Sequence, residues 1–420
     1  MNQNEGFVCS GELGLTRRQL ITTGIGATVG ASMYGCATGA RPIASERESS
    51  GLAPGVTYFN HASLGTCPES VVRKQIEMIR HRETNPWRYM HGHGWDDEKQ
   101  AYREAMCRSL GCTDEMFTCT HTTQEACHIL ASGLPLGPDD EVLFSSINHF
   151  SCDQCWHRWG ALRGYSVREF EFPIERAPEL TEKEIVDLHI DQIGPRTSVL
   201  VLPHVDYLLG LRHPIEAITR DAKRRGVRYV VVDGAQIHGM LPVDVRALGV
   251  DAYVGSSHKW MQTPKGVGYL VTRPELHFEM ARMWTLGPIE HGSDLEVNTT
   301  RDFACWFSSV EAVRLRETYG YERAERVLCD LRDHAYERVR PNGRLRWNSP
   351  VGWELGCSIV CFEVRGVEQR DVLARMRETH GYVFRSFDRD YYRGIRLSFH
   401  VQNTHEQIDS FFDTLEREFA

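Results

Sequence analysis

Tyr229-Val230-Val231-Val232-Asp233-Gly234-Ala235-Gln236 is an apolar run of strand length that ends in a carboxylate. Further along, Ser256-Ser257-His258-Lys259-Trp260 places a lysine 26 residues after that carboxylate. Apolar residues flank this second segment on both sides, which predicts a turn between two buried strands. Because ligands of open α/β sheets collect at the carboxyl ends of the strands, we expect Asp233 at such an edge, with Lys259 on the turn.

Strand-like runs and helical patterns alternate around this segment. The predicted strands cover 142–144, 198–202, 229–232 and 251–254, and the predicted helices cover 69–84, 96–110 and 214–225, the last stopped by Gly226. Apolar runs joined by crossover helices are typical of strands buried on both faces of a parallel sheet. The chain is therefore expected to have an α/β fold with a mostly parallel sheet.

The pattern changes after about residue 300. Long charged helices are expected over 308–339, strands over 357–364 and 394–399, and a closing helix from His405. We interpret this as a smaller α+β domain over 296–420, following a large domain over 56–295. A polar, turn-rich linker over 41–55 precedes them.

The pairing of Asp233 with Lys259 predicts a cofactor. A lysine amine can hold an aldehyde as a Schiff base, and a buried carboxylate can keep a pyridine nitrogen protonated so that the ring accepts electrons. These are the requirements of pyridoxal 5'-phosphate. Lysines are mostly solvated surface groups, but the apolar flanks of Lys259 indicate a desolvated amine with a lowered pKa.

The first 40 residues resemble a twin-arginine signal peptide. Thr16-Arg17-Arg18-Gln19-Leu20-Ile21 precedes an uncharged stretch, 22–31, that is too short and too weakly apolar to anchor in a bilayer. We therefore expect export by the Tat machinery to the periplasm or another extracytoplasmic site. Lipid anchoring at Cys36, ordinary cleavage near Ala40 and a cytoplasmic, non-exported protein stay open.

Charge and cysteine content narrow the class of partner. The chain has 420 residues and a net charge of -9, with 48 basic and 57 acidic residues and no long basic run, so a nucleic acid is not expected.

The 13 cysteines of the chain are an odd number in mostly apolar contexts, which indicates free buried thiols. Cys152 and Cys155 have the spacing of a redox or metal-binding pair, but a single such motif without a second pair is a weak signal. His91 and His93, near His81, lack the carboxylate or cysteine ligands of a metal site, so no metal is expected.

Four motifs resemble those of class V aminotransferase-fold enzymes, in particular the isopenicillin N epimerase-like branch. They are the lysine segment with Pro264-Lys265-Gly266-Val267-Gly268, the opening segment 58–65 with Pro68, Thr300-Arg301-Asp302, and Ile395-Arg396-Leu397-Ser398 followed by Asn403-Thr404. They occur in the same order as in that branch and span nearly the whole chain after the leader. The resemblance implies the fold type I of pyridoxal phosphate-dependent transferases, with a sheet of the seven-stranded type.

The resemblance also implies roles for individual residues. Asp233 would pair with the pyridine nitrogen, Gln236 would hydrogen-bond the ring oxygen, and His149 would stack on the ring. Ser256 and His258 would bind the phosphate, together with the helix that begins near Thr123 and Gln124. Gln124 stands where relatives usually carry a second threonine. Thr300 would reach the phosphate of the neighbouring subunit, which implies a homodimer.

Arg396 is the candidate for binding the substrate carboxylate, because its planar fork of donors suits a carboxylate. A carboxylate clamp beside an aldehyde trap predicts an amino acid or an amino-acid-like amine as the substrate. His61 is a further candidate for substrate binding. It could also supply an acid on the second face of the substrate, as could Tyr391 or Tyr392.

Several reactions stay open for this set of residues: epimerisation, amino transfer, and a C–S or other β-lyase reaction. Cysteine desulfuration is disfavoured, because 385–393 ahead of the substrate arginine contains no cysteine and Tyr207 stands where desulfurase-like relatives carry asparagine. A non-catalytic exported binding protein is the alternative from another class. It would not require Lys259, Asp233 and Arg396 all to be intact.

Overall fold

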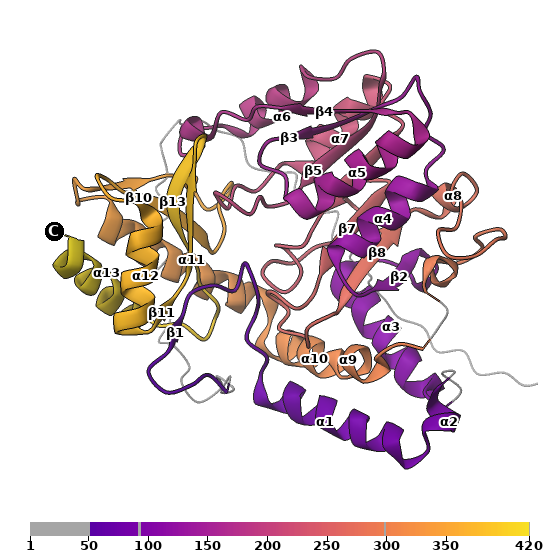
Figure 1. Ribbon diagram of the computed structural model, residues 1–420, viewed down its shortest axis with the longest axis horizontal. Coiled ribbons are helices and arrows are strands. Elements are labelled where there is room, and N and C mark those ends of the chain that lie inside the picture. Colours follow the sequence, from indigo (N-terminus) through magenta and orange to yellow (C-terminus); the bar gives the residue numbers. More distant parts are fainter. Residues whose placement is uncertain (1–50, 91–93, 298–299, 420) are drawn as a thin grey trace, which may run out of the picture. The chain divides into compact units, whose positions relative to one another are not determined.

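The structure is a computed structural model that describes residues 51–90, 94–297 and 300–419, all within one compact unit (Figure 1). The predicted leader, with Cys36, and most of the linker lie outside the described residues, as do His91 and His93. Within the described ranges, no helix is both long enough and apolar enough to cross a bilayer.

The large sheet has seven strands in the order β2-β8-β7-β6-β5-β3-β4. Their bounds are β2 Phe117–Thr120, β3 Glu141–Ser145, β4 Ser166–Phe170, β5 Thr197–Pro203, β6 Tyr229–Asp233, β7 Ala252–Ser256 and β8 Gly268–Thr272. The pairs from β4 to β7 are parallel, and β8 runs antiparallel to β7 and to β2. The predicted α/β fold with a mostly parallel sheet is confirmed.

Both faces of this sheet are buried, because consecutive apolar side chains point to opposite sides. Val199 and Val201 pack with α4 (Thr123–Gly133) and α5 (Phe150–Arg163). Leu200 and Leu202 pack with α3 (Asp96–Leu110), α6 (Glu182–Ile190) and α7 (Ile215–Arg224). By the same alternation, Asp233 follows Val231 onto the face covered by α4 and α5.

A second, antiparallel sheet forms after residue 340, in the order β12-β13-β10-β9 (Figure 1, orange and yellow). Its strands are β9 Leu345–Trp347, β10 Ile359–Val364, β12 Arg385–Arg389 and β13 Tyr392–Ser398. It shares one apolar core with α11 (Tyr321–Val339), α12 (Gln369–His380) and α13 (His405–Phe419). The helices predicted over 308–339 are α10 (Ser309–Tyr319) and α11, which Gly320 separates with a φ of 86°, a conformation that helices do not use.

The N-terminal segment joins the two parts of the fold. β1 (Thr57–Tyr58) pairs in parallel with β11 (Tyr382–Val383), and α1 (Glu69–Thr84) then packs against α9 (Phe303–Phe307) and α10 (Ser309–Tyr319). The short helices α2 (Pro86–Met90) and α8 (Pro274–His277) complete the described helices. A boundary at residue 295 remains a prediction, since chain from both sides of it contributes to the same packing.

Candidate active site

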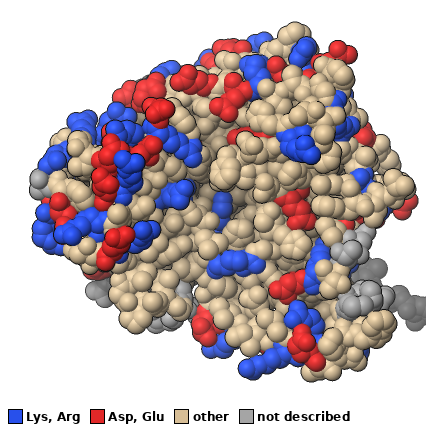
Figure 2. All heavy atoms as spheres, viewed as in Figure 1, with Lys and Arg blue, Asp and Glu red and all other residues tan. Residues whose placement is uncertain are grey.

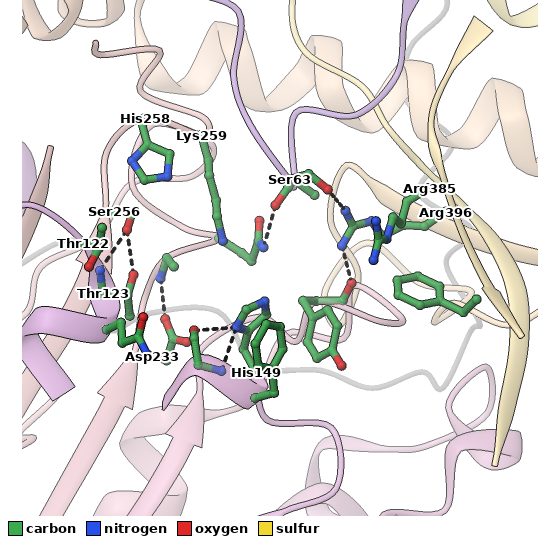
Figure 3. A pocket seen from close by; sticks show the side chains of 18 of the residues that line it. Ser63, Thr122, Thr123, His149, Asp233, Ser256, His258, Lys259, Arg385 and Arg396 are labelled. Carbon is green, nitrogen blue, oxygen red and sulfur yellow. Dashed lines mark hydrogen bonds between the residues drawn. The ribbon is translucent and has the colours of Figure 1, made fainter. Parts of the chain in front are cut away.

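A cavity of about 420 Å³ lies where β3, β5, β6 and β7 of the large sheet end. The residues that line it are Ala62, Ser63, Thr122, Thr123, Gln124, His149, Phe150, Ser151, Tyr207, Asp233, Ala235, Gln236, Ser256, His258, Lys259, Arg385, Phe387, Arg389 and Arg396. Two groups of these residues face each other across Lys259 (Figure 3). We call Thr123, His149, Asp233, Ser256 and His258 the sheet wall, and Arg385, Phe387, Arg389 and Arg396 the arginine wall.

Asp233 and Lys259 provide the charges at the base of the cavity. Asp233 is the last residue of β6 and is 8% exposed; one carboxylate oxygen accepts a hydrogen bond of 2.9 Å from the amide of Ala235. Burial raises the pKa of Asp233, while the nearby Lys259 lowers it. Burial lowers the pKa of Lys259 to about 8, and Asp233 opposes that shift. The amine can therefore be neutral near physiological pH, which a nucleophile or base requires.

The amino terminus of α4 forms a polar corner beside the lysine. The Thr122 side chain caps the helix by accepting from the amide of Glu125. The Ser256 hydroxyl accepts a 3.0 Å hydrogen bond from the amide of Thr123 and lies 2.7 Å from its hydroxyl. The start of a helix attracts anions, because its first amides have no partners within the helix and its dipole is positive there. This corner therefore brings together hydroxyls and helix-start amides, the donors that bind phosphate oxygens.

His149 ends the loop after β3 and caps α5. Its Nδ1 lies 2.7 Å from the Ser151 hydroxyl, and its ring contacts Tyr207 edge-on, with 4.8 Å between centroids. Burial lowers the pKa of His149 to about 3, with a further lowering from Lys259 and nearby arginines. The ring is therefore a neutral, flat surface in the cavity, as the predicted stacking role requires.

Gln236 and His258 line the cavity, and each has a polar atom that can still form a hydrogen bond. The Gln236 amide donates to the carbonyl of Ala62 at 3.0 Å and accepts from the Trp260 indole at 2.8 Å, which leaves one N–H for a ligand. Nδ1 of His258 is buried without a hydrogen-bond partner, and burial lowers the pKa of this histidine to about 4. A bound group would satisfy both side chains.

Arg396 dominates the arginine wall. It is 3% exposed and donates to the carbonyl of Tyr207 at 2.7 Å and to Asn60 Oδ1 at 3.3 Å, with a further bond to the Ser63 hydroxyl. Its Nε is buried without a partner, and although Arg396 lowers the pKa of the buried Asp206, no described carboxylate lies within ion-pair distance of the guanidinium. A buried guanidinium without a counterion is costly, so the geometry favours an anionic ligand here.

Four sequence candidates lie away from this cavity. His61 is 2% exposed and stacks on His400 with 4.9 Å between centroids, so it is not among the lining residues. Thr300 is exposed, and its cross-subunit role remains a prediction. Tyr391 and Tyr392 do not line the cavity either: Tyr391 is exposed in the turn between β12 and β13, and Tyr392, the first residue of β13, packs against Phe387.

Sequence reasoning missed most of the arginine wall. Arg385, Phe387 and Arg389 lie on β12, an edge strand whose alternation places these three residues on one face. Arg389 donates a 2.9 Å hydrogen bond to the Tyr207 hydroxyl. The period-two spacing of 385, 387 and 389 was visible in the sequence, but the charged segment contains no apolar run that would mark it as a strand.

The cavity fits pyridoxal phosphate by the chemistry of its donors. It joins a buried amine of lowered pKa, a buried carboxylate, a flat neutral ring, a helix start with two hydroxyls, and an orphaned imidazole nitrogen. The predicted cofactor contacts of Thr123, Gln124, His149, Asp233, Gln236, Ser256, His258 and Lys259 thus come from residues that line one cavity.

The remaining polar groups offer little for metal or disulfide chemistry. Cys152 and Cys155 are buried, and the cysteines of the described ranges form no disulfide. Those ranges contain no group of three or more side chains that could hold a metal ion. On the face drawn in Figure 2, acidic and basic residues are interspersed, so that face has no extended basic surface for a nucleic acid.

Comparison with known sequences places the chain in one family. The sequence profile described as Aminotransferase class-V matches residues 57–411. Isopenicillin N epimerase of Amycolatopsis lactamdurans is 28% identical over 70% of this chain and 78% of its own length. The epimerase of Streptomyces clavuligerus is 26% identical over 87% of this chain and 95% of its own length. A probable cysteine desulfurase of Halobacterium salinarum is 26% identical over 87% and 92%, respectively.

Solved structures show the same fold. A cystine C–S lyase in complex with its reaction product, cysteine persulfide, superposes with a TM-score of 0.78 at 21% identity, covering 85% of this chain and 96% of that chain. The cysteine desulfurase CsdA of Escherichia coli superposes with a TM-score of 0.76 at 22% identity, covering 90% and 98%. The fold type that the resemblance implied is therefore confirmed.

Proposed function

Because this chain belongs to the class V aminotransferase family, whose cofactor is pyridoxal phosphate, we propose that Lys259 acts at the α-carbon of an amino acid or amino-acid-like amine. The observation that carries this proposal is the placement of Lys259 between a carboxylate-bearing sheet wall and an uncompensated Arg396. The first would hold a cofactor and the second a substrate carboxylate. The cavity is large enough for a small ligand beside the cofactor.

Different residues of the cavity have different roles in the proposed reaction. When bound, the cofactor supplies an aldehyde for the amine and a ring that accepts electrons from the α-carbon. Asp233 would hold a proton at the ring nitrogen, and Thr123, Ser256 and His258 would hold the phosphate. Arg396 orients the substrate through its carboxylate. Lys259, with its pKa lowered to about 8, is poised to remove and return the α-proton.

Epimerisation or amino transfer is the reaction class that we favour. The two epimerase relatives support it, and so does a single lysine able to carry the α-proton between positions. Epimerisation also requires an acid on the second face. Among the lining residues, the candidates for this acid are Ser63, whose hydroxyl accepts from Arg396, and Tyr207, whose hydroxyl accepts from Arg389.

A C–S or other β-lyase is the second candidate, with support from desulfurase relatives over nearly the same length. The residues that line the cavity include no cysteine, and β12 carries none either. A persulfide-forming desulfurase needs a thiol that reaches the substrate. A lyase that expels its β-group without a protein thiol is compatible with the cavity.

One experiment separates these reactions. Purified holoenzyme is incubated with L- and D-amino acids in deuterium oxide, while α-deuteration, chirality, keto acid and sulfide are followed together. Loss of chirality without keto acid would identify an epimerase, and keto acid that requires an added acceptor would identify a transaminase. Keto acid without an acceptor would identify a lyase. The variant Lys259→Arg is the control. If neither the unaltered protein nor this variant gave α-deuteration with any substrate, a binding protein would be favoured.

We further propose a homodimer exported by the Tat machinery. The dimer would bring Thr300, which is exposed in the single chain, to the partner's phosphate site. The support for export is the sequence of the leader. Sedimentation of the holoenzyme and fractionation of cells carrying Arg17→Lys and Arg18→Lys would test the two proposals separately.

A further inference from the structure

A second cavity, of about 300 Å³, lies beside the segment that follows the catalytic lysine. It is bounded by α10, by Met261 and Gln262, and by the turn after β13. Its lining residues include Met261, Gln262, Leu315, Arg316, His400 and Val401. None of these residues lines the active-site cavity, so the second cavity is a separate place in the fold.

Arg316 is the unusual residue of this cavity. It is 6% exposed, and it forms no ion pair with any carboxylate of the described residues. One terminal nitrogen donates to Nε2 of His400 at 2.8 Å and contacts the carbonyl of Trp260 at 3.5 Å. The other, Nη1, is buried without a partner. An arginine cannot escape burial by losing its proton, so its charge needs an anion.

The groups around Arg316 supply no negative charge. His400 is fully buried and stacks on His61, and burial lowers the pKa of His400 well below its usual value, so both rings are neutral. Burial likewise lowers the pKa of Arg316, with only the hydroxyls of Tyr319 and Tyr321 opposing it. None of these neutral groups compensates the charge of this guanidinium.

The rest of the cavity suits a small ligand with an apolar body. Met261, Leu315 and Val401 provide hydrocarbon surface, and the side-chain amides of Gln262 and Gln402 provide polar contacts. Gln262 has a φ of 58°, the one positive value among non-glycine residues of the described ranges. Its amide donates to Thr66 and to Gln402, and these bonds hold the strained residue at the cavity wall.

We propose that this cavity is a binding site for a small monocarboxylate with a hydrocarbon body, whose carboxylate pairs with Arg316. The site is distinct from the Arg396 clamp and does not depend on the proposed reaction. Arg316 contacts the carbonyl of Trp260, the residue directly after Lys259, so an occupant would touch the loop that carries the catalytic amine.

Isothermal titration of the holoenzyme with hexanoate tests the proposal. Hexan-1-ol serves as the neutral isostere and should bind at least tenfold more weakly. Because hexanoate could also bind Arg396, the titration is repeated with Arg316→Met and with Arg396→Met. Binding should weaken at least tenfold in Arg316→Met and persist in Arg396→Met. Loss of binding only in Arg396→Met would overturn the proposal, as would equal binding of the alcohol.

A second variant guards against misfolding of Arg316→Met. Leu315→Trp fills the cavity from a half-buried position and leaves Arg316 in place, so it should also abolish hexanoate binding. Arg314→Gln, on the same helix but outside the cavity, is the matched control and should bind hexanoate as the unaltered protein does. Unchanged binding in Leu315→Trp, or no binding to the unaltered holoenzyme, would contradict the proposed site.

Discussion

The sheet wall and the arginine wall differ in how their polar groups are satisfied. On the sheet wall, Ser256 and Thr123 bond to each other, His149 bonds to Ser151, and Asp233 accepts from a backbone amide. On the arginine wall, Arg396 is bonded only to neutral oxygens and has no carboxylate partner. Apart from Nδ1 of His258, these polar groups of the sheet wall are bonded within the protein, whereas the arginine wall lacks an anion.

This difference indicates two kinds of ligand. A set of mutually bonded neutral groups positions a resident group that stays through the reaction, with Asp233 as its charged contact. An uncompensated guanidinium favours an anion that enters and leaves. If this contrast is right, changes on the sheet wall should reduce turnover most, and changes on the arginine wall should mainly weaken substrate binding.

Replacing Asp233 by asparagine should have the largest effect on the sheet wall. The change removes the charge that holds a proton at the ring nitrogen, so turnover should fall by roughly a hundredfold or more, the size seen when one preorganised electrostatic group is lost. Steady-state kinetics of the holoenzyme measures this. Asp153→Asn is the control, since burial raises the pKa of Asp153 to about 8 and its carboxyl is mostly protonated at neutral pH. Equal losses in both variants would contradict the role of Asp233.

Replacing Arg396 by methionine should act on substrate binding. Loss of one partner of a buried charged contact costs about 2–5 kcal/mol, so kcat/KM should fall by roughly thirtyfold to several thousandfold. Most of the change should appear in KM. Arg393→Gln is the matched control on the same strand, because Arg393 pairs with Glu368 at the surface. An unchanged KM in Arg396→Met would contradict the role of the arginine wall in substrate binding.

The pKa of Lys259 predicts that the rate of cofactor capture depends on pH and on Asp233 of the sheet wall. Only the neutral amine attacks an aldehyde, so capture of pyridoxal phosphate by the cofactor-free protein should rise roughly tenfold per pH unit and level off above about 8. Asp233 raises the pKa of Lys259, so the midpoint should move to lower pH in Asp233→Asn. Stopped-flow absorbance measures both midpoints, and a midpoint near the ordinary lysine value of 10.5 would show that the amine is not desolvated.

Ser63→Ala should have the smallest effect and tests the support of the arginine wall. The hydroxyl of Ser63 accepts from Arg396, and a typical hydrogen bond contributes about 0.5–1.5 kcal/mol, so KM should rise roughly two- to twelvefold with kcat nearly unchanged. Initial-rate measurements decide this. A larger fall in kcat than in substrate affinity would assign Ser63 to the reaction itself, for example on the second face of the substrate.

Much of the sheet wall could be predicted because its signals are local. The apolar run before Asp233 and the two strands around Lys259 follow from hydrophobic pattern alone. Elsewhere in the chain, the helices over 69–84 and 96–110 likewise have the predicted bounds. The roles of His149, Ser256 and His258 came from family resemblance, since a lone histidine or serine in a loop carries no such signal.

The arginine wall is assembled from segments far apart in the chain. Arg396 meets Asn60 and Ser63, more than 330 residues away, because β1 pairs with β11 and Asn60 bridges to Ser398. A two-residue strand has no sequence pattern of its own. His61 was expected near the substrate for its position in this segment, but the local alternation turns its ring toward His400 and away from the cavity.

The covalent link between Lys259 and the cofactor is the claim on which the rest depends. Borohydride reduction of the holoenzyme, followed by peptide mass spectrometry, tests it directly. We predict one reduced phosphopyridoxyl group on the peptide that contains Lys259, loss of the visible absorbance on reduction, and neither result in Lys259→Ala. A label on another lysine, or no label on a protein that still turns over amino acids, would contradict the account.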